Sequence, residues 1–383
     1  MYKKTILFVE NKFTIPIIKL AALLRREGWK TILLNLSPLS KLDYDFIKRY
    51  FNEIIIFDMT SIKNFFNPQK YSSLMNTIRN KNPNIIQFTG PDWHTYLMFI
   101  LLKKYPRVFF AHDIWKPYFK RIQFKKNSGR MIFFNRLIER SSFKNAEGDL
   151  HKGPEDELKL LGIKTKNNDL QYLSGCMEEW LIKPDKNHKL SNEDGKSHLV
   201  YAGGPWVTFN GWISFIDIIK KITSQKIHFH IFCPYNVRIN ESFKKIEREN
   251  SYFHMHRPLR GKKLNEELSK FDYGIIPTFF DSDIVGENFK KITVATKIFT
   301  YLEAGIPCLV SKELQFSSKI VESNNMGLSI TLGDLNKLGT ILKHQNYGSF
   351  IKHILKAQKK FGMGLQMEKL RTFYDKAVLK YRV

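Results

Sequence analysis

Short, almost continuously apolar runs alternate with longer amphipathic segments along most of the chain, and this alternation limits the possible folds more than any other feature. Runs such as "KTILFVE" (4–10) and "KTILLNL" (30–36) lack the polar alternation of a strand with one wet face. The segment "TIPIIKLAALLRREG" (14–28) has helical spacing, with Thr14 near its start and Gly28 just past its end. Buried strands separated by helices indicate a parallel sheet covered on both faces, so an α/β fold is predicted.

The alternation occurs twice, with a polar interruption between the two series. Residues 183–197 are charged and poor in apolar residues, and the second series restarts at "HLVYAGG" (198–204). With 383 residues, the chain exceeds one ordinary core. We therefore expect two Rossmann-like, doubly wound domains facing across a cleft. The expected parts are an amino-terminal domain (1–182), a linker (183–197), a carboxyl-terminal domain (198–345) and terminal helices that pack back on the first domain (346–383).

Charge and cysteine content narrow the classes of partner. The 62 Lys and Arg against 36 Asp and Glu give a formal charge of +26, which suits an anionic partner or reflects lysines on every solvated face. The basic residues are scattered and no nucleic-acid motif is present, so nucleic acid is not expected.

Three widely spaced cysteines fit the core of a protein in a reducing compartment. No apolar run approaches the roughly 20 residues of a spanning helix, so we expect a cytoplasmic protein, at most peripheral on the inner face of the membrane.

The stretch "TKIFTYLEAGIPCLVS" (296–311) carries the most specific chemistry. Helical spacing places Lys297, Thr300 and Tyr301 on one face, with Glu303 at its edge. Lys290 and Lys291 come shortly before this helix. The amino end of a helix carries partial positive charge, and together with lysines it suits a diphosphate.

This stretch resembles the carboxyl-domain signature of GT-B glycosyltransferases, in which a lysine precedes a glutamate-tyrosine-leucine run that ends in glycine-x-proline. The segment "LVYAGG" (199–204) is similar to the first strand and glycine turn of the donor domain. The segment "VFFAHD" (108–113) resembles the amino-domain strand that ends in a histidine near the reacting sugar. The likeness covers nearly the whole chain and is greatest to the family 4 retaining transferases.

The resemblance implies transfer of a hexose-like sugar from a nucleoside-diphosphate sugar to a glycan or lipid-linked acceptor, as in surface polysaccharide synthesis. It implies a retaining, metal-independent reaction with no cofactor. His112 and Asp113 are the implied catalytic residues: His112 would hydrogen-bond the donor sugar, and Asp113 would orient that imidazole or line the acceptor site. The basic amino-domain surface is expected to hold the acceptor at an anionic membrane face. The expected donor-binding residues are Gly203, Gly204, Lys290, Lys291, Lys297, Thr300, Tyr301 and Glu303.

Departures from the family pattern keep two other functions open. Thr300 stands where the family has a ribose-binding glutamate, and Gly204 and Asn210 stand where it has an arginine and a lysine. The second hypothesis is therefore a non-catalytic partner protein that binds a sugar nucleotide or a glycan. A nucleotide-sugar epimerase is the third, disfavoured because no acidic cleft residues can be located.

Two further patterns could in principle bind a metal. "DSD" (281–283) matches a D-x-D motif of a different transferase fold, and "HFH" (228–230) and "HMH" (254–256) each pair histidines on one face of a strand. Three-residue matches arise often by chance, and no third type of ligand follows at close spacing. We therefore expect strand-surface histidines and no metal site.

Overall fold

The computed structural model describes residues 4–60, 67–112, 114, 128–166, 168–206, 211–233, 240–281 and 285–382. The chain divides into two compact units. Unit 1 contains the described residues up to 114, those from 128 to 174, and 363–382. Unit 2 contains the described residues of 175–362. Asp113, Asn210 and residues 282 and 283 of the "DSD" motif lie outside the described residues.

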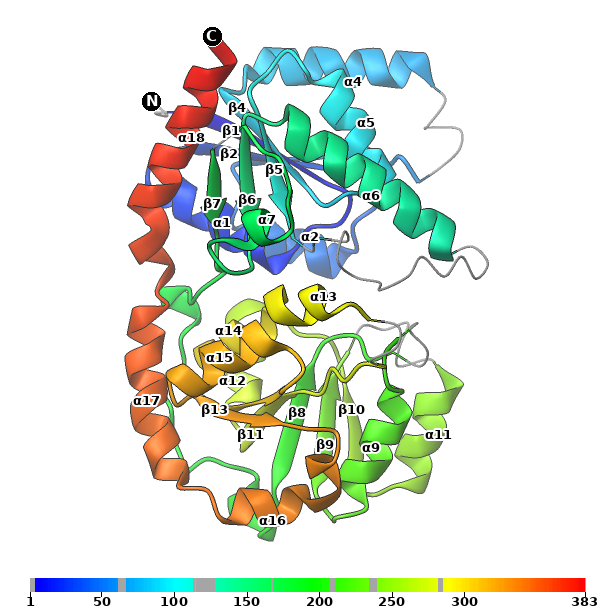
Figure 1. Cartoon of the computed structure of the whole chain (residues 1–383), viewed down its shortest axis with the longest axis vertical. Helices are drawn as coiled ribbons and strands as arrows, with labels where there is room; N and C mark the ends of the chain where they lie inside the picture. The colour runs from blue at the N-terminus through cyan, green and yellow to red at the C-terminus, as the bar shows by residue number, and fades with distance from the viewer. Residues whose placement is uncertain are drawn as a thin grey trace. The chain divides into compact units, whose positions relative to one another are not determined.

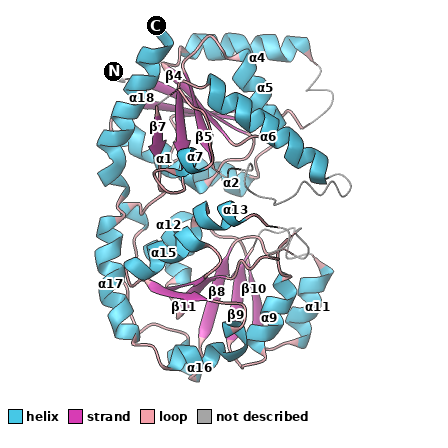
Figure 2. Ribbon diagram, viewed as in Figure 1, coloured by secondary structure: helices cyan, strands magenta, loops and turns pink. Residues whose placement is uncertain are grey.

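Unit 1 is built on a parallel sheet of seven strands in the order β3-β2-β1-β4-β5-β6-β7. The order reverses between β1 and β4, the position at which doubly wound sheets bind ligands. Figures 1 and 2 show helices on both faces of this sheet. The strands are β1 (Thr5–Glu10), β2 (Lys30–Asn35), β3 (Glu53–Ile56), β4 (Ile85–Thr89), β5 (Arg107–Ala111), β6 (Gly148–His151) and β7 (Asp169–Gln171).

Local sequence signals account for the ends of the unit 1 helices. Pro16 lies in the first turn of α1, and Gly28 follows that helix with φ of 83°. Asn67 caps α4 by accepting a hydrogen bond from Lys70 N (3.1 Å), and Asn82 ends it in the left-handed region. The helices are α1 (Ile15–Arg26), α2 (Lys41–Ile47), α4 (Pro68–Lys81), α5 (Trp93–Leu101), α6 (Ser128–Asn145), α7 (Glu157–Leu160) and α18 (Met367–Arg382).

Unit 2 is built on a parallel sheet of six strands in the order β10-β9-β8-β11-β12-β13. The order reverses between β8 and β11, as it does between β1 and β4 of unit 1. The prediction of two doubly wound, Rossmann-like sheets is therefore confirmed. The strands are β8 (His198–Ala202), β9 (His228–Phe232), β10 (Phe253–His256), β11 (Tyr273–Ile276), β12 (Cys308–Ser311) and β13 (Gly327–Ile330).

Helices also cover both faces of the unit 2 sheet (Figure 2). Most of them follow the strands in alternation, as expected of parallel connections. The helices are α8 (Ser191–Asp194), α9 (Phe215–Thr223), α11 (Glu241–Glu249), α12 (Gly261–Leu268), α13 (Glu287–Ile292), α14 (Lys297–Glu303), α15 (Gln315–Ser323), α16 (Leu338–Lys343) and α17 (Tyr347–Lys360), with the 3-10 turns η1 (Glu178–Trp180) and η2 (Asp334–Lys337).

The polar segment 183–197, expected as a linker, lies within unit 2 and is bound to its sheet. Lys189 Nζ donates hydrogen bonds to the carbonyls of Ser269 (2.6 Å) and Phe271 (3.0 Å). Ser191 Oγ donates to Asp272 Oδ1 at 2.5 Å. A polar composition therefore marks a surface segment with ordered contacts, since its polar groups bind the end of a neighbouring helix and strand.

The carboxyl-terminal region is helical but interrupted, as its glycines predict. Helix α17 ends at Lys360, Gly362 and Gly364 follow, and a 3-10 turn, η3 (Met363–Gln366), leads into α18. Helix α18 packs on β5, β6 and β7 of unit 1 (Figure 1). None of the described helices combines the length and the apolar content needed to span a membrane.

Candidate functional site

The turn after β8 brings two of the predicted donor-binding residues into contact. Gly203 has φ of 152°, and a Cβ atom at this position would lie 2.7 Å from Lys297 Cε and 3.3 Å from its Nζ. Because that space is filled by the lysine, only glycine fits here without displacing it. Gly203 N donates to Phe232 O (2.9 Å), which fixes the turn against β9. The carboxyl end of β8 therefore presents an ammonium group beside exposed backbone at Gly204.

Lys297 is half-buried at the first position of α14, with its Nζ 5.0 Å from the centre of the Tyr201 ring. Among the described residues, no carboxylate lies within 4.0 Å of this ammonium group. An unpaired, partly desolvated cation beside a glycine turn is an anion-binding arrangement, since a phosphate supplies the negative charge that the neighbouring protein groups do not. Helix α14 has only seven residues, so the anion site depends on the lysine more than on a helix dipole.

Tyr301 is fully buried and joins two strands of the sheet. Its hydroxyl donates to Ile275 O (3.0 Å) and accepts from Ala202 N (3.1 Å). A Cβ atom on Gly274 would lie 2.3 Å from the Tyr301 ring, so the ring fills the space above that glycine. The structure thus gives Tyr301 a supporting position under the β8 turn, while Thr300 is half-buried one turn after Lys297.

Glu303 is turned to the backbone of the segment that enters unit 2. Its side chain is 1% exposed and accepts hydrogen bonds from Met177 N (2.8 Å) and Asn265 Nδ2 (3.5 Å). Its own carbonyl accepts from Ile182 N at 2.7 Å. These contacts use the carboxylate to anchor residues 177–182, so the structure does not bring Glu303 together with Lys297 as a ligand group.

The other two predicted lysines have different surroundings. Lys290 is buried, with its Nζ 3.2 Å from Glu287 Oε1 and 3.9 Å from Glu313 Oε2. Burial raises the pKa of Glu313. The hydrogen bond from Phe280 N and the charge of Lys290 oppose this shift, because both stabilise the carboxylate. Lys291 is exposed. Of the three lysines, only Lys297 therefore offers both proximity to Gly203 and an unneutralised charge among the described residues.

Aromatic side chains line the same end of β8, and the sequence analysis did not single them out. Trp206 packs against Trp212 with ring centres 4.6 Å apart, and its Nε1 donates to Ile213 O (2.6 Å). Tyr201 and Trp206 both contact Phe215 at 5.0 Å. Aromatic faces beside a cation suit a nucleotide or a sugar ring. The tryptophans in "GGPWVTFNGW" were the available signal.

In unit 1, the predicted His112 directly follows β5 and is half-buried. Its backbone N donates to Phe110 O (3.0 Å), and its ring stands edge-on to the Phe110 ring with centres 5.9 Å apart. The structure confirms the expected position at a strand end, where ligand contacts concentrate in this type of sheet. Asp113, the other predicted catalytic residue, is outside the described residues.

A buried polar cluster at the β1–β4 reversal was also missed by the sequence analysis. Glu10 and Asn35 are paired in register at the last positions of β1 and β2, and both are fully or almost fully buried. Four side-chain atoms here have no hydrogen-bond partner among the described residues, which is costly inside a protein unless a ligand or water pairs with them. These atoms are Glu10 Oε1, Asn11 Oδ1, Thr14 Oγ1 and Asn35 Oδ1.

In this unit 1 polar cluster, burial raises the pKa of two carboxyl groups. Burial raises the pKa of Glu10 well above its usual range, the Thr89 hydroxyl opposes the shift, and Asp92 adds to it. Asp92, which caps α5 by accepting from Thr95 N (3.0 Å), also has its pKa raised, mainly by burial. A protonated Glu10 can donate as well as accept, so the cluster is suited to neutral hydroxyl groups.

Comparison with known proteins gives a family match for part of the chain. Residues 207–372 match the family model described as "Glucosyltransferase 3-like, C-terminal domain". The match covers a little under half of the chain and falls mainly on unit 2, including Lys297. No curated protein matches the chain significantly.

Solved structures match both units. Sucrose-phosphate synthase from Thermosynechococcus elongatus is 13% identical with a TM-score of 0.69, covering 97% of this chain and all of that one. HepE of Anabaena, solved with UDP and glucose, is 11% identical with a TM-score of 0.68 and coverage of 96% and 99%. A Listeria monocytogenes protein described as a UDP-N-acetylglucosamine 2-epimerase is 14% identical with a TM-score of 0.59 and coverage of 97% and 95%. The predicted GT-B fold is confirmed, while placement in family 4 stays a prediction.

Proposed function

We propose that this protein is a glycosyltransferase that moves a hexose-like sugar from a nucleoside-diphosphate sugar to a hydroxyl group of a glycan or lipid-linked acceptor. The observation that carries the proposal is the unneutralised Lys297 ammonium against the Gly203 turn at the end of β8. The family match over residues 207–372 and the GT-B fold support the same activity. The solved relative that contains UDP and glucose favours a uridine nucleotide as the donor.

In this proposal, unit 2 binds the donor and stabilises its leaving group. Charge develops on the diphosphate as the glycosidic bond breaks, and Lys297 provides a fixed positive charge at that position. A preorganised cation in a partly desolvated site stabilises this charge, which fits the metal-independent reaction that the family resemblance implies. The aromatic side chains of Tyr201 and Trp206 line the nucleotide site. A retaining outcome follows the resemblance to family 4 enzymes.

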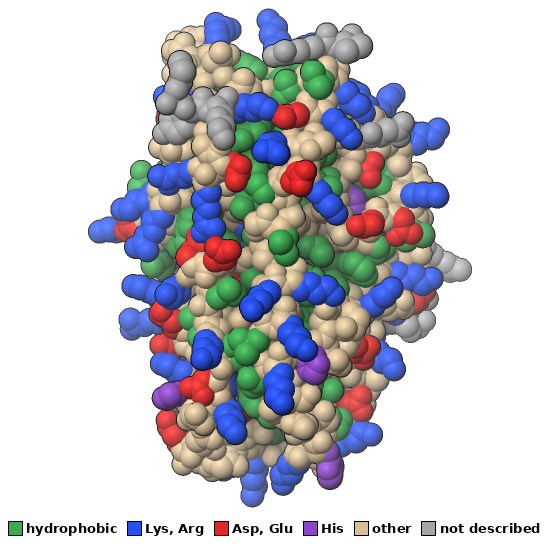
Figure 3. Space-filling model, turned by 90° about the vertical axis from the view of Figure 1, so that its left-hand side faces the viewer, with side chains coloured by type: hydrophobic (Ala, Val, Ile, Leu, Met, Phe, Trp, Pro, Cys, Tyr) green, Lys and Arg blue, Asp and Glu red, His purple; other side chains and the backbone are tan. Residues whose placement is uncertain are grey.

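Unit 1 then binds the acceptor. The unit 1 polar cluster offers unpaired oxygens of Glu10, Asn11 and Asn35, which suit the hydroxyl groups of a glycan. His112 contacts the donor sugar, with Asp113 orienting it or lining the acceptor site. Figure 3 shows Lys and Arg spread over the drawn face with acidic groups among them, so the net charge of +26 supports loose attraction to anionic membrane lipids better than one defined docking patch.

Two other functions make different predictions. A non-catalytic partner protein would bind the sugar nucleotide without turnover, and it is favoured by Thr300 and Gly204, which replace groups common in active relatives. An epimerase would convert the sugar nucleotide without any acceptor, and one of the structural relatives is described as such an enzyme. Both remain second to the transferase because Lys297 lies in the part of the chain that matches a glucosyltransferase family model.

Acceptor-dependent release of nucleotide separates these functions. The full chain is incubated with labelled nucleoside-diphosphate sugars, with and without membrane extract. We expect release that requires the extract, and a decrease of about a hundredfold in His112→Ala, since a lost contact to the reacting sugar weakens transition-state binding. His188→Ala, at an exposed residue, serves as the control. Binding without release indicates the partner protein, isomerised donor without extract indicates the epimerase, and unchanged release in His112→Ala excludes that role.

A further inference from the structure

Five histidines lie on one face of the unit 2 sheet, although the sequence suggested only isolated pairs. His198 begins β8, His228 and His230 belong to β9, and His254 and His256 belong to β10. Register pairs His198 with His228 and His230 with His254 across three adjacent strands. Because side chains two residues apart on a strand share a face, all five rings gather there. We call them the histidine cluster.

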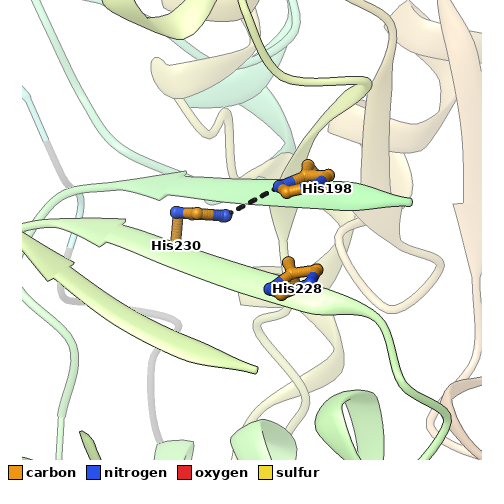
Figure 4. A group of neighbouring side chains, drawn as sticks. All are labelled: His198, His228 and His230. Carbon is orange, nitrogen blue, oxygen red and sulfur yellow. Dashed lines mark hydrogen bonds between the residues drawn. The ribbon is translucent and has the colours of Figure 1, made fainter. Parts of the chain in front are cut away.

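Hydrogen bonds connect the rings of the histidine cluster. In each of them, Nδ1 of a histidine on one strand faces Nε2 of a histidine on the next strand. His198 Nδ1 lies 3.0 Å from His230 Nε2, His230 Nδ1 lies 2.9 Å from His256 Nε2, and His228 Nδ1 lies 2.9 Å from His254 Nε2. Figure 4 shows His198 and His230 edge to edge, with His228 beneath His198. The rings of His198 and His228 are stacked, with centres 4.5 Å apart and planes 9° from parallel.

Asp194 lies close to His198 and His228, the histidines that begin β8 and β9, and fixes which nitrogen of His198 carries the proton. Its Oδ1 lies 3.2 Å from His198 Nε2, and its Oδ2 lies 3.1 Å from His228 Nε2. A carboxylate accepts, so His198 Nε2 holds hydrogen and His198 Nδ1 keeps a lone pair, whereas His228 Nε2 lies close to Asp194 without forming a hydrogen bond among the described residues. A carboxylate behind an imidazole is the usual outer partner of a metal-binding histidine.

We propose that His198, His228 and His230 bind a borderline divalent transition metal, of which Zn²⁺ is the representative. Each offers one ring nitrogen, and these three nitrogens lie within 4.8 Å of one another. Tetrahedral zinc with Zn–N bonds of about 2.0–2.1 Å needs nitrogens roughly 3.3–3.4 Å apart. Binding therefore replaces the His198–His230 hydrogen bond with two coordination bonds, releases the proton of that hydrogen bond from the ligating nitrogen, and brings the three nitrogens closer by up to about 1.4 Å.

The position of this site separates it from the proposed donor site. His198 and His228 begin β8 and β9, whereas Gly203 and Lys297 lie beyond the other end of β8. The metal therefore has no contact with the departing diphosphate and acts on stability by joining β8 to β9. His198 and His230 are buried, His228 is half-buried and Asp194 is exposed. The ion can therefore enter from the side of His228 and Asp194.

Titration of the untagged full chain with Zn²⁺ alone, followed by calorimetry and thermal unfolding, tests the proposal. We expect one Zn²⁺ per chain, a higher unfolding temperature, and at least tenfold weaker binding in His228→Asn, which changes a half-buried residue. Such changes follow because loss of one of three protein ligands removes a coordination bond. His188→Asn is the control, since it removes an exposed imidazole that lies outside the histidine cluster, and it should keep the wild-type affinity.

A second readout covers the case in which His228→Asn folds poorly. Co²⁺ in a tetrahedral nitrogen site absorbs visible light, so wild-type protein should develop a band that one equivalent of Zn²⁺ removes. Absence of stoichiometric binding, equal binding in wild type and His228→Asn, or an equal loss in His188→Asn would each overturn the assignment. UDP binding should be unchanged in His228→Asn, so failure here is distinguishable from failure of the transferase proposal.

Discussion

At the scale of single residues, position relative to a neighbour decides the role more than residue type does. Lys290, Lys291 and Lys297 are alike in the sequence, but the first is neutralised by two glutamates and the second is exposed. Only the third fills the space above a glycine. The sequence predicted Lys297 because of its place in a family pattern. It could not exclude Lys290, because one of the two partners of Lys290, Glu313, comes from a distant part of the chain.

Glu10 gives a prediction at this scale. Its raised pKa means that the folded state keeps a proton that the unfolded state loses above its ordinary value near 4.5. Its contribution to stability is therefore fully present below that pH and is lost as pH rises through the folded-state pKa. Glu10→Gln should remove this dependence and be more stable than wild type at neutral pH, as measured by urea unfolding between pH 4 and 8.

The exposed Glu155→Gln is the control and should reproduce the wild-type dependence on pH. A Glu10→Gln protein whose stability falls with rising pH as steeply as wild type would contradict the buried, protonated carboxyl. Nothing in the local sequence "VENKF" indicated this group, because its burial results from the pairing of β1 with β2 and β4.

At the scale of elements, the hydrophobic pattern and the capping residues predict most strands and helices. They do not predict which strands become neighbours in the folded sheet. The opening helix, the break at Gly362 and Gly364, and the short helix before Gly305 were all predictable from local signals. The histidine cluster was not, since β8, β9 and β10 become neighbours only in the folded sheet. Local sequence shows two histidines on a strand but not the third that faces them.

Tyr301 provides the prediction for elements. Tyr301→Phe leaves Ala202 N–H and Ile275 C=O without their shared hydroxyl partner, at a buried position between β8 and β11. We expect a loss of about 1–3 kcal/mol in the free energy of unfolding, measured in urea, because buried polar groups then lack a partner.

Tyr347→Phe is the matched control for this substitution. Its hydroxyl donates only to Asp272 O (3.0 Å), and the side chain is half-buried, so water can replace the bond. Its loss should be clearly smaller. Equal stability of the Tyr301→Phe and Tyr347→Phe proteins would show that the Tyr301 hydroxyl does not join the strands.

At the scale of the whole molecule, each unit has one reversal of strand order, and a candidate site lies at each reversal. One carries the unit 1 polar cluster and the other carries Lys297 beside Gly203. The doubled α/β pattern predicted both sheets. The polar segment 183–197 was a poorer guide, because composition reports solvent exposure and not which sheet a segment binds.

Calorimetric titration of the full chain with UDP tests the central claim most directly. We expect wild type and the exposed-site control Lys291→Met to bind UDP with equal affinity, and Lys297→Met to bind about 10- to 100-fold more weakly, since a hydrogen bond to a charged group contributes roughly 1.5–3 kcal/mol. Equal UDP affinity in wild type and Lys297→Met, or no binding to wild type, would contradict the claim that unit 2 holds a diphosphate through Lys297.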